Sequence, residues 1–282
     1  MKTAETGQRR SWVAIIVVTL LCILWLLPTV GLLVTSFRPI DDINSSGWWE
    51  AIFKPAFTLQ NYVGVFDKSD MGMAFINALA VAVPATIIPI MFAAFAAYAF
   101  TFLEFKGKDF LFITIVAVMV VPLQVALQPM LDLLGPRGLG IAGQYVAVWM
   151  LHTGFGMPLA IYTLRNYMTT LPKSIIESAK MDGATHYQTF WRLVFPMSTP
   201  AIAGFAILQF LWVWNDLLIA LLFLKPDNQT VIVSLKGMLG TQGQGWELLT
   251  AGGFISMALP LLVFIALQRY FVRGMTAGAV KG

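Results

Sequence analysis

Long apolar stretches separated by short polar segments dominate the chain. A helix needs about 20 predominantly apolar residues to cross the hydrocarbon core of a bilayer. Six stretches reach this length: residues 12–37, 73–103, 110–134, 141–164, 199–224 and 248–267. The first is longer than the apolar core of a cleaved signal peptide, so we expect it to remain as an anchor. The pattern predicts an all-α integral membrane protein with six transmembrane helices.

Several of these stretches contain proline, which removes a backbone N–H and would break a helix in water. Pro84 and Pro89 both fall within the second stretch, for example. In a membrane such prolines are tolerated because neighbouring helices satisfy the carbonyl groups that they free. Small residues at four-residue spacing, such as Ala93 and Ala97, predict close helix packing.

Composition excludes most soluble classes. Of 282 residues, 58% are hydrophobic and 11% are charged, which is too few charges to cover the surface of a soluble enzyme. The single cysteine, Cys22, lies in an apolar run. It therefore provides neither a disulfide framework nor a thiolate metal cluster.

The basic residues predict the orientation. With six spans both termini lie on one side, and the segments on that side hold twelve of the 18 Lys and Arg residues. Cytoplasmic segments carry the excess of Lys and Arg, so both termini are predicted to be cytoplasmic. The net charge of +4 follows from this topology and is no evidence for a nucleic-acid partner.

The segment 165–198 between the fourth and fifth spans is long for a compact bundle and rich in helix signals. Ser174 and Glu177 have the spacing of a capping box, and Gly183 is a natural helix stop. A second short helix is predicted at about 186–195, ending at Pro196. The first helix carries enough apolar residues to fill a shallow groove on another protein: Ile175, Ile176, Ala179 and Met181. A helix lying on lipid headgroups is the alternative.

The connection 225–247 on the opposite side is rich in glycine and polar residues. It is predicted to be a flexible polar loop that either contacts a partner or caps the bundle. Its candidate contact residues are Gly237, Gly240, Gln242, Gly243, Gln244 and Gly245.

Polar side chains within the spans are costly in lipid, so they are expected to face the bundle interior or a pathway. Amides, carboxylates and aromatic rings together suit a hydroxyl-rich sugar. The alternatives are hydrogen bonds between helices, contact with a partner subunit or, for Asp132, helix capping. The candidate pathway residues are Gln124, Gln128, Tyr145, Trp149, His152, Gln209, Trp212, Asn215 and Asp216.

Other chemistry finds little support in the residues. No Gly-x-x-x-x-Gly-Lys-Ser/Thr run is present to hold ATP phosphates. His152 and His186 have no metal-ligand spacing, so no metal site is predicted. An intramembrane enzyme lacks a nucleophile and base pair. A proton-coupled secondary carrier, with Asp216 or Asp132 as the relay, stays open as an alternative.

Residues 177–184, Glu-Ser-Ala-Lys-Met-Asp-Gly-Ala, and 190–196, Phe-Trp-Arg-Leu-Val-Phe-Pro, resemble the EAA loop of permease subunits of binding-protein-dependent ABC importers. The ending 268–282 and Trp214-Asn215-Asp216 are similar to maltose-transporter-type permeases of carbohydrate uptake, which include α-glucoside permeases. The likeness extends from about Asn77 to the end. Ser178 departs from it by standing where the loop has alanine.

This resemblance implies a type I ABC importer permease fold and a transport subunit without enzyme activity. The implied partners are a second homologous permease, two copies of a cytoplasmic ATPase that bind ATP and Mg, and an extracytoplasmic sugar-binding protein. No cofactor is then expected in this chain, and the Gly- and Gln-rich loop would enter the sugar cleft of the binding protein. The residues implied to couple to the ATPase are Ser174, Ile175, Ile176, Glu177, Ala179, Met181, Asp182, Gly183 and Ala184.

The resemblance also implies three parts and a location. Residues 1–72 would form an N-terminal tail, the first helix and an outer loop. Residues 73–268 would form the ABC transmembrane type-1 domain, with the coupling loop at about 166–198, and residues 269–282 a cytoplasmic tail reaching between the ATPases. In a bacterial or archaeal cytoplasmic membrane, this subunit would form half of the pathway for an oligosaccharide or α-glucoside.

Overall fold

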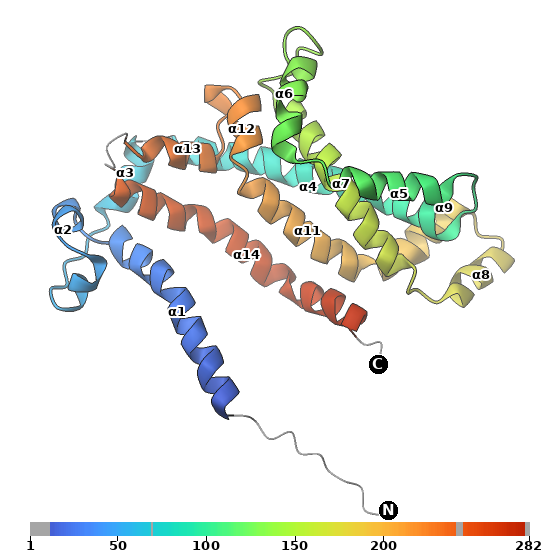
Figure 1. The fold of residues 1–282 in the computed structure, drawn as a ribbon, viewed down its shortest axis with the longest axis horizontal. Helices are drawn as coiled ribbons and strands as arrows, with labels where there is room; N and C mark the ends of the chain where they lie inside the picture. The colour runs from blue at the N-terminus through green and yellow to red at the C-terminus, as the bar shows by residue number, and fades with distance from the viewer. Residues whose placement is uncertain (1–11, 69, 241–244, 280–282) are drawn as a thin grey trace, which may run out of the picture. The chain divides into compact units, whose positions relative to one another are not determined.

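The computed structural model describes residues 12–68, 70–240 and 245–279, and beyond residue 268 it describes the backbone alone. The chain forms two compact units (Figure 1). Unit 1 comprises Met1–Ser69 and Gly237–Ile255, and unit 2 comprises Asp70–Lys236 and Ser256–Gly282. Helix α14, Trp246–Ala279, belongs to both units. Its backbone remains helical through residues 269–279, which were predicted as a tail.

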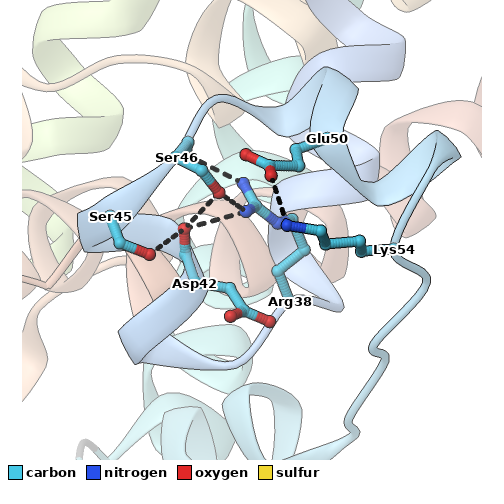
Figure 2. A network of polar contacts seen from close by, with 6 residues as sticks. All are labelled: Arg38, Asp42, Ser45, Ser46, Glu50 and Lys54. Atoms are coloured by element: carbon cyan, nitrogen blue, oxygen red, sulfur yellow. Dashed lines mark hydrogen bonds and ion pairs between the residues drawn. The ribbon is translucent and has the colours of Figure 1, made fainter.

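Unit 1 is organised around Arg38, which follows the first long helix. Arg38 is 4% exposed, and its guanidinium donates to the backbone oxygens of Asp42 and Ser46 and to the Ser46 hydroxyl (Figure 2). Asn61 donates to the backbone oxygens of Ser36 and Arg38. These bonds fasten the short elements to the end of α1. The elements are α1 Trp12–Ser36, α2 Ile40–Ser45, the 3-10 turn η1 Trp48–Ile52 and α3 Gln60–Lys68.

Unit 2 is a bundle built on α4, Met71–Phe102, which packs most extensively against α7, Tyr145–Met168, and α11, Thr199–Trp214 (Figure 1). Small residues make this packing close, because Ala82, Ala85, Ala93 and Ala97 of α4 are completely buried. The other elements are α5 Lys108–Val118, α6 Leu123–Leu134, α8 Lys173–Met181, α9 His186–Thr189, the π-helical turn η2 Phe190–Val194, α10 Phe195–Met197, α12 Leu218–Phe223, the 3-10 turn η3 Pro226–Asn228 and α13 Val231–Met238.

The prolines of unit 2 show how neighbouring helices satisfy freed carbonyls. A proline removes the hydrogen bond to the carbonyl four residues earlier, so Pro84 frees Ala80 and Pro89 frees Ala85. The Trp149 indole Nε1 donates to the Ala80 oxygen at 2.9 Å. The Gln209 amide Nε2 donates to the Ala85 oxygen at 3.2 Å.

The same arrangement recurs on α14. Pro260 frees the carbonyl of Ser256, and the Trp214 indole Nε1 donates to that oxygen at 3.2 Å. The general expectation from the sequence is confirmed at all three carbonyls. In each case a side chain from another helix replaces the missing backbone donor.

The predicted third span, 110–134, is not one helix. Helix α5 ends at Val118, α6 begins at Leu123, and the two are bent by 98°. Pro122 lies at the junction, where it lacks an N–H and disfavours the α conformation of the preceding residue.

The predicted fifth span, 199–224, is also interrupted, because α11 ends at Trp214 and α12 begins only at Leu218. Two polar side chains at the break bond to the backbone in place of the helix. The Asn215 amide donates to the Leu211 oxygen, and the Asp216 carboxylate accepts from the Ala220 N–H. Asn and Asp favour such local bonds over a continuous helix.

Within the described residues, three helices have the length and composition to cross a membrane: α1, α4 and the Trp246–Gln268 part of α14. Two bent pairs, α5 with α6 and His186–Met197 with α11, bring this number to five if each pair is one span. Helix α7 is not in this set, since polar residues such as His152 and Arg165 lower its mean hydropathy. The count of six spans stays a prediction.

The connection 225–247 is more ordered than predicted. It contains η3 and α13, and Val231, Val233 and Leu235 of α13 are buried. These apolar residues recur at every second position, a spacing that does not predict a helix. In unit 2 the Asn77 amide of α4 holds the start of this connection by donating to the backbone oxygens of Asp227 and Gln229.

The carbonyl arrangement on α4 predicts a non-additive pair of substitutions. Trp149→Phe leaves the Ala80 oxygen without a donor and is expected to destabilise the protein by about 1 kcal/mol. In a Pro84→Ala background, the restored N–H of residue 84 satisfies the same oxygen, so Trp149→Phe should then cost little. Thermal unfolding in detergent measures both effects.

The matched control combines Trp149→Phe with Pro89→Ala, which restores a bond to a different carbonyl. In that background the cost of Trp149→Phe should equal its cost in the wild type. Equal costs in the Pro84→Ala and Pro89→Ala backgrounds would contradict the assignment.

Candidate functional site

Helix α8 carries most of the predicted coupling residues and is anchored by a single side chain. Ile176 is 4% exposed and belongs to the apolar core that also contains Leu171, Phe190 and Val194. The remaining face is open to solvent, with Met181 88% exposed and Ile175 39% exposed. Ser174, Glu177, Asp182 and Gly183 are also exposed, and Ala179 and Ala184 are half-buried. Charged and apolar side chains on one exposed face suit docking into a groove.

The predicted capping box at Ser174 and Glu177 is wrong. Helix α8 begins at Lys173 with Pro172 in the N-cap position, so Ser174 is already the second helical residue. Pro172 is preorganised to begin a helix but has no side-chain oxygen to cap one. The spacing from Ser174 to Glu177 therefore fits a cap that the chain does not form.

The predicted stop at Gly183 is confirmed. The Gly183 N–H donates to the Lys180 oxygen and the Ala184 N–H donates to the Ala179 oxygen, which is the bond pattern of a Schellman motif. Gly183 has φ of +80°, a conformation that glycine adopts without the steric cost paid by other residues. The end of α8 thus depends on glycine at this position.

The capping box that the segment does form lies eleven residues later. Thr185 accepts from the Gln188 N–H, and the Gln188 side chain accepts from the Thr185 N–H. The helix that begins here passes through the π turn Phe190–Val194 and ends at Met197, so it runs past Pro196, its predicted end. Pro196 lies one residue before the end of this continuous helix.

Side chains of α4 fasten this segment to the bundle. The Tyr98 hydroxyl and His186 Nδ1 are hydrogen-bonded at 3.0 Å. The rings of Phe95 and Phe190 are stacked with centroids 4.5 Å apart, and Trp191 packs edge-on against Phe95. The start of the segment 186–195 is thus attached directly to α4 by a hydrogen bond and aromatic contacts. In the sequence, Phe190, Trp191 and Phe195 were the only indication of these aromatic contacts.

The candidate pathway residues divide into two groups. Gln124, Gln128 and Asp132 on α6 are exposed, and so is Asn215. Trp212 is 38% exposed, and its ring meets that of His152 edge-on at 5.2 Å. These side chains are available to a ligand or a partner.

The second group bonds to other helices or lies deep within unit 2. Trp149 and Gln209 satisfy the carbonyls freed by the prolines, and the Tyr145 hydroxyl donates to Asn77 Oδ1 at 2.8 Å. Hydrogen bonding between helices, one of the alternatives left open by the sequence, accounts for these three. Asn77 is not among the predicted pathway residues, although it is an amide within an apolar span.

His152 and Asp216 form a buried polar pair. His152 is fully buried, and among the described residues neither of its ring nitrogens has a hydrogen-bond partner. Its Nε2 lies 3.8 Å from Asp216 Oδ2, and its backbone oxygen accepts from the Gln209 amide. A Cβ at Gly156 would lie 2.8 Å from this amide, so a larger residue there would require the Gln209 side chain to shift.

The predicted binding-protein loop is described only in part. Gly237 and Gly240 are exposed. Gly245 has φ of +91°, and a Cβ there would lie 2.2 Å from the Met238 oxygen, so only glycine fits. Gln242, Gly243 and Gln244 lie outside the described residues.

Apolar helices long enough to cross a membrane, with a short helix exposed at one end, define an integral membrane protein. The chain belongs to the family described as binding-protein-dependent transport system inner membrane component, which matches residues 89–277. It is a permease subunit of the ABC importer class and not an enzyme.

Relatives and solved structures agree with this membership. The chain is 51% identical to the osmoprotective compounds uptake permease protein GgtD of Synechocystis sp., over 94% of this chain and 91% of that protein. It is 47% identical to the alpha-glucoside transport system permease protein AglG of Rhizobium meliloti, over 88% of this chain and 68% of that protein. A chain from the crystal structure of a bacterial alginate ABC importer shares the fold with a TM-score of 0.74, at 18% identity, covering 96% of this chain and 99% of that one.

The caps of the coupling segment predict opposite outcomes for two substitutions. Thr185→Val keeps the side-chain shape but removes the capping oxygen, so it should destabilise the start of α9 by about 1 kcal/mol. Ser174→Ala should have little effect, because Ser174 caps no helix. Hydrogen exchange at the Gln188 amide reports the first effect, and exchange at the amides of α8 reports the second. The structure would be contradicted if Ser174→Ala accelerated exchange at the amides of α8 more than Thr185→Val accelerated exchange at the Gln188 amide.

Proposed function

We propose that this subunit forms half of the translocation pathway of an ATP-driven importer for an α-glucoside or a related oligosaccharide. Its partners are a second homologous permease, two copies of a cytoplasmic ATPase and an extracytoplasmic sugar-binding protein. The ATPase binds ATP and Mg, and this chain carries no cofactor of its own. Both termini lie in the cytoplasm.

The identity to AglG, whose name specifies alpha-glucosides, is the observation that carries the substrate class. Two further relatives support a carbohydrate. The trehalose transport system permease protein SugB of Mycobacterium tuberculosis is 31% identical over 98% of this chain, and the arabinooligosaccharides transport system permease protein AraQ of Halalkalibacterium halodurans is 29% identical over 99%. A solved structure of the same fold, with a TM-score of 0.67, holds the alginate transporter in complex with a pentasaccharide-bound periplasmic protein.

In the proposed mechanism α8 seats in a groove of the ATPase, with Ile175, Glu177 and Met181 as contacts. Closure of the two ATPases then displaces α8 as a rigid element. Ile176 and the aromatic contacts between α4 and the segment 186–195 carry that displacement into the bundle. A population shift between inward-facing and outward-facing states follows only if these attachments do not slip.

The pathway is proposed to use the side chains that remain available. Gln124, Gln128, Trp212 and Asn215 offer amide groups and an aromatic face to a sugar. His152 packs against the Trp212 ring and lies beside Asp216, so these two residues position Trp212 rather than contact the substrate. Trp149 and Gln209 hold α4, α7 and α11 together instead of lining the pathway.

Uptake measurements in cells that lack the chromosomal copy of this gene test the substrate class. Cells complemented with the chain should take up labelled trehalose or maltose, and an excess of unlabelled α-glucoside should suppress this uptake roughly tenfold. Cellobiose, a β-glucoside of the same size, should not compete. Uptake abolished by a protonophore at constant ATP would instead support the proton-coupled carrier and overturn the proposal.

The end of α8 provides a test of coupling. Gly183→Val places a β-branched residue at φ of +80°, at a cost of about 1–2 kcal/mol, so α8 should fray and uptake should fall while the protein still inserts. Gly183→Asn is the matched control, since asparagine tolerates this conformation. No atom lies within 4 Å of a Cβ built at Gly183, so backbone strain alone separates the two variants.

ATP hydrolysis by the assembled complex distinguishes uncoupling from loss of assembly. Gly183→Val should leave the complex assembled and hydrolysing ATP without uptake. Full uptake in Gly183→Val would contradict this account of coupling. Loss of uptake in Gly183→Asn would show that packing, and not backbone conformation, requires glycine.

A further inference from the structure

A charged cavity in unit 2 is lined by residues of α4, α5, α7 and α8. Its volume is about 410 Å³. Lys108, Arg165 and Lys173 line it, together with Glu104 and Asp109. None of these residues belongs to the coupling or pathway sets, so the cavity has no role in the proposed function.

Arg165 is the unusual member of this group. Its guanidinium carbon lies 4.1 Å from the centre of the Phe112 ring, a cation–π contact that holds the side chain in place. Within the described part of the chain its Nε is buried without a hydrogen-bond acceptor. Arg165 also lines the cavity, and a guanidinium has five donors in a rigid fork, so the Phe112 contact holds these donors in a fixed position beside the cavity.

The cavity lining holds three cations against the two carboxylate residues Glu104 and Asp109, both of which are exposed, so its net charge favours an anion. Lys108 donates to the Leu103 oxygen and pairs with Glu104 at 3.5 Å, but the Glu104 side chain is 93% exposed and therefore extends into solvent. Lys173 is the first residue of α8, and the N-terminus of a helix favours negative charge. Arg165 and Lys173 thus present two cations and a helix N-terminus to the same space.

The surroundings indicate the kind of anion. Phe100, Phe102 and Met168 form apolar walls of the cavity. Helix α5 begins at the cavity and continues as an exposed apolar surface, with Phe110 77% exposed and Ile113 65% exposed. An amphiphile with an anionic head and an acyl chain matches a charged cavity that continues into an apolar helix face.

We infer that this cavity binds the phosphate of an anionic phospholipid, with Arg165 as the principal contact, Lys173 as the second, and the acyl chain lying along α5. A bidentate Arg–phosphate pair would satisfy the donors that Arg165 has free. Because Lys173 begins α8, the bound headgroup also stabilises the first turn of the helix proposed to contact the ATPase. The lipid content of the membrane would therefore tune coupling.

The test uses the intact transporter complex in nanodiscs of phosphatidylcholine with a minor fraction of phosphatidylglycerol. Native mass spectrometry counts the phosphatidylglycerol retained after the complex is released from the discs. Arg165→Gln should lower retention roughly tenfold, because a charge-assisted bond is lost. Lys173→Gln should lower it less, and Arg165→Lys should retain an intermediate amount.

Lys106→Gln is the matched control, since Lys106 is exposed in the neighbouring turn, does not line the cavity and carries the same charge. It should retain phosphatidylglycerol as the wild type does. Lys173 is exposed on α8, so its variant keeps the test decisive even if Arg165→Gln fails to fold. Lipid retention is measured without substrate, so its outcome is independent of the uptake experiments.

Hydrogen exchange at the first turn of α8 provides the second readout. It should be slower in discs with phosphatidylglycerol than in phosphatidylcholine alone, and Arg165→Gln should abolish this difference. Wild-type retention in both Arg165→Gln and Lys173→Gln would overturn the inference. Equal protection by inorganic phosphate in phosphatidylcholine discs would overturn the lipid assignment in favour of a soluble anion, and protection that requires only the ATPase would assign Arg165 to a protein carboxylate.

Discussion

Carbonyl groups freed by proline, and the side chains that satisfy them, hold the helices of unit 2 together. Ala80, Ala85 and Ser256 each lose a backbone donor to a proline four residues later, and Trp149, Gln209 and Trp214 supply a replacement. In a bilayer no water competes for such a carbonyl, so an unmatched one is costly. Each bond fixes one helix against another at a defined height, which apolar packing in lipid does not do by itself.

Helix α4 carries two of these three carbonyls and makes contacts near both of its ends. Near its start Asn77 holds the connection that follows α12, and near its end Phe95 and Tyr98 hold the segment between α8 and α11. Between these ends, completely buried alanines bring its backbone close to α7. Helix α4 therefore contacts the segment that follows α8 near one end and the connection after α12 near the other.

These hydrogen bonds between helices explain why polar residues in the apolar stretches did not by themselves identify a substrate pathway. A tryptophan or glutamine in an apolar helix has one or two donors, and an unsatisfied carbonyl on the next helix uses them completely. Trp149 and Gln209 are occupied in this way, whereas Gln124 and Gln128 remain exposed. Arg165 differs from these residues. Its guanidinium packs on the Phe112 ring, and among the described residues its Nε has no hydrogen-bond acceptor. This difference is the reason for proposing a separate role for it.

The sequence by itself determined the class, because membrane solvation imposes long apolar stretches that no soluble fold tolerates, and because the residues 177–184 are typical of one kind of permease loop. It also determined the stop at Gly183, since a left-handed residue after a helix is a local requirement. The cap at Thr185 and the breaks at 119–122 and 215–217 have local causes in Gln188, Pro122, Asn215 and Asp216, although the apolar pattern did not predict them. The tertiary structure decided the order within 225–247. It also decided which side chains meet the freed carbonyls, since a donor and its carbonyl lie on different helices and only packing sets their height and rotation.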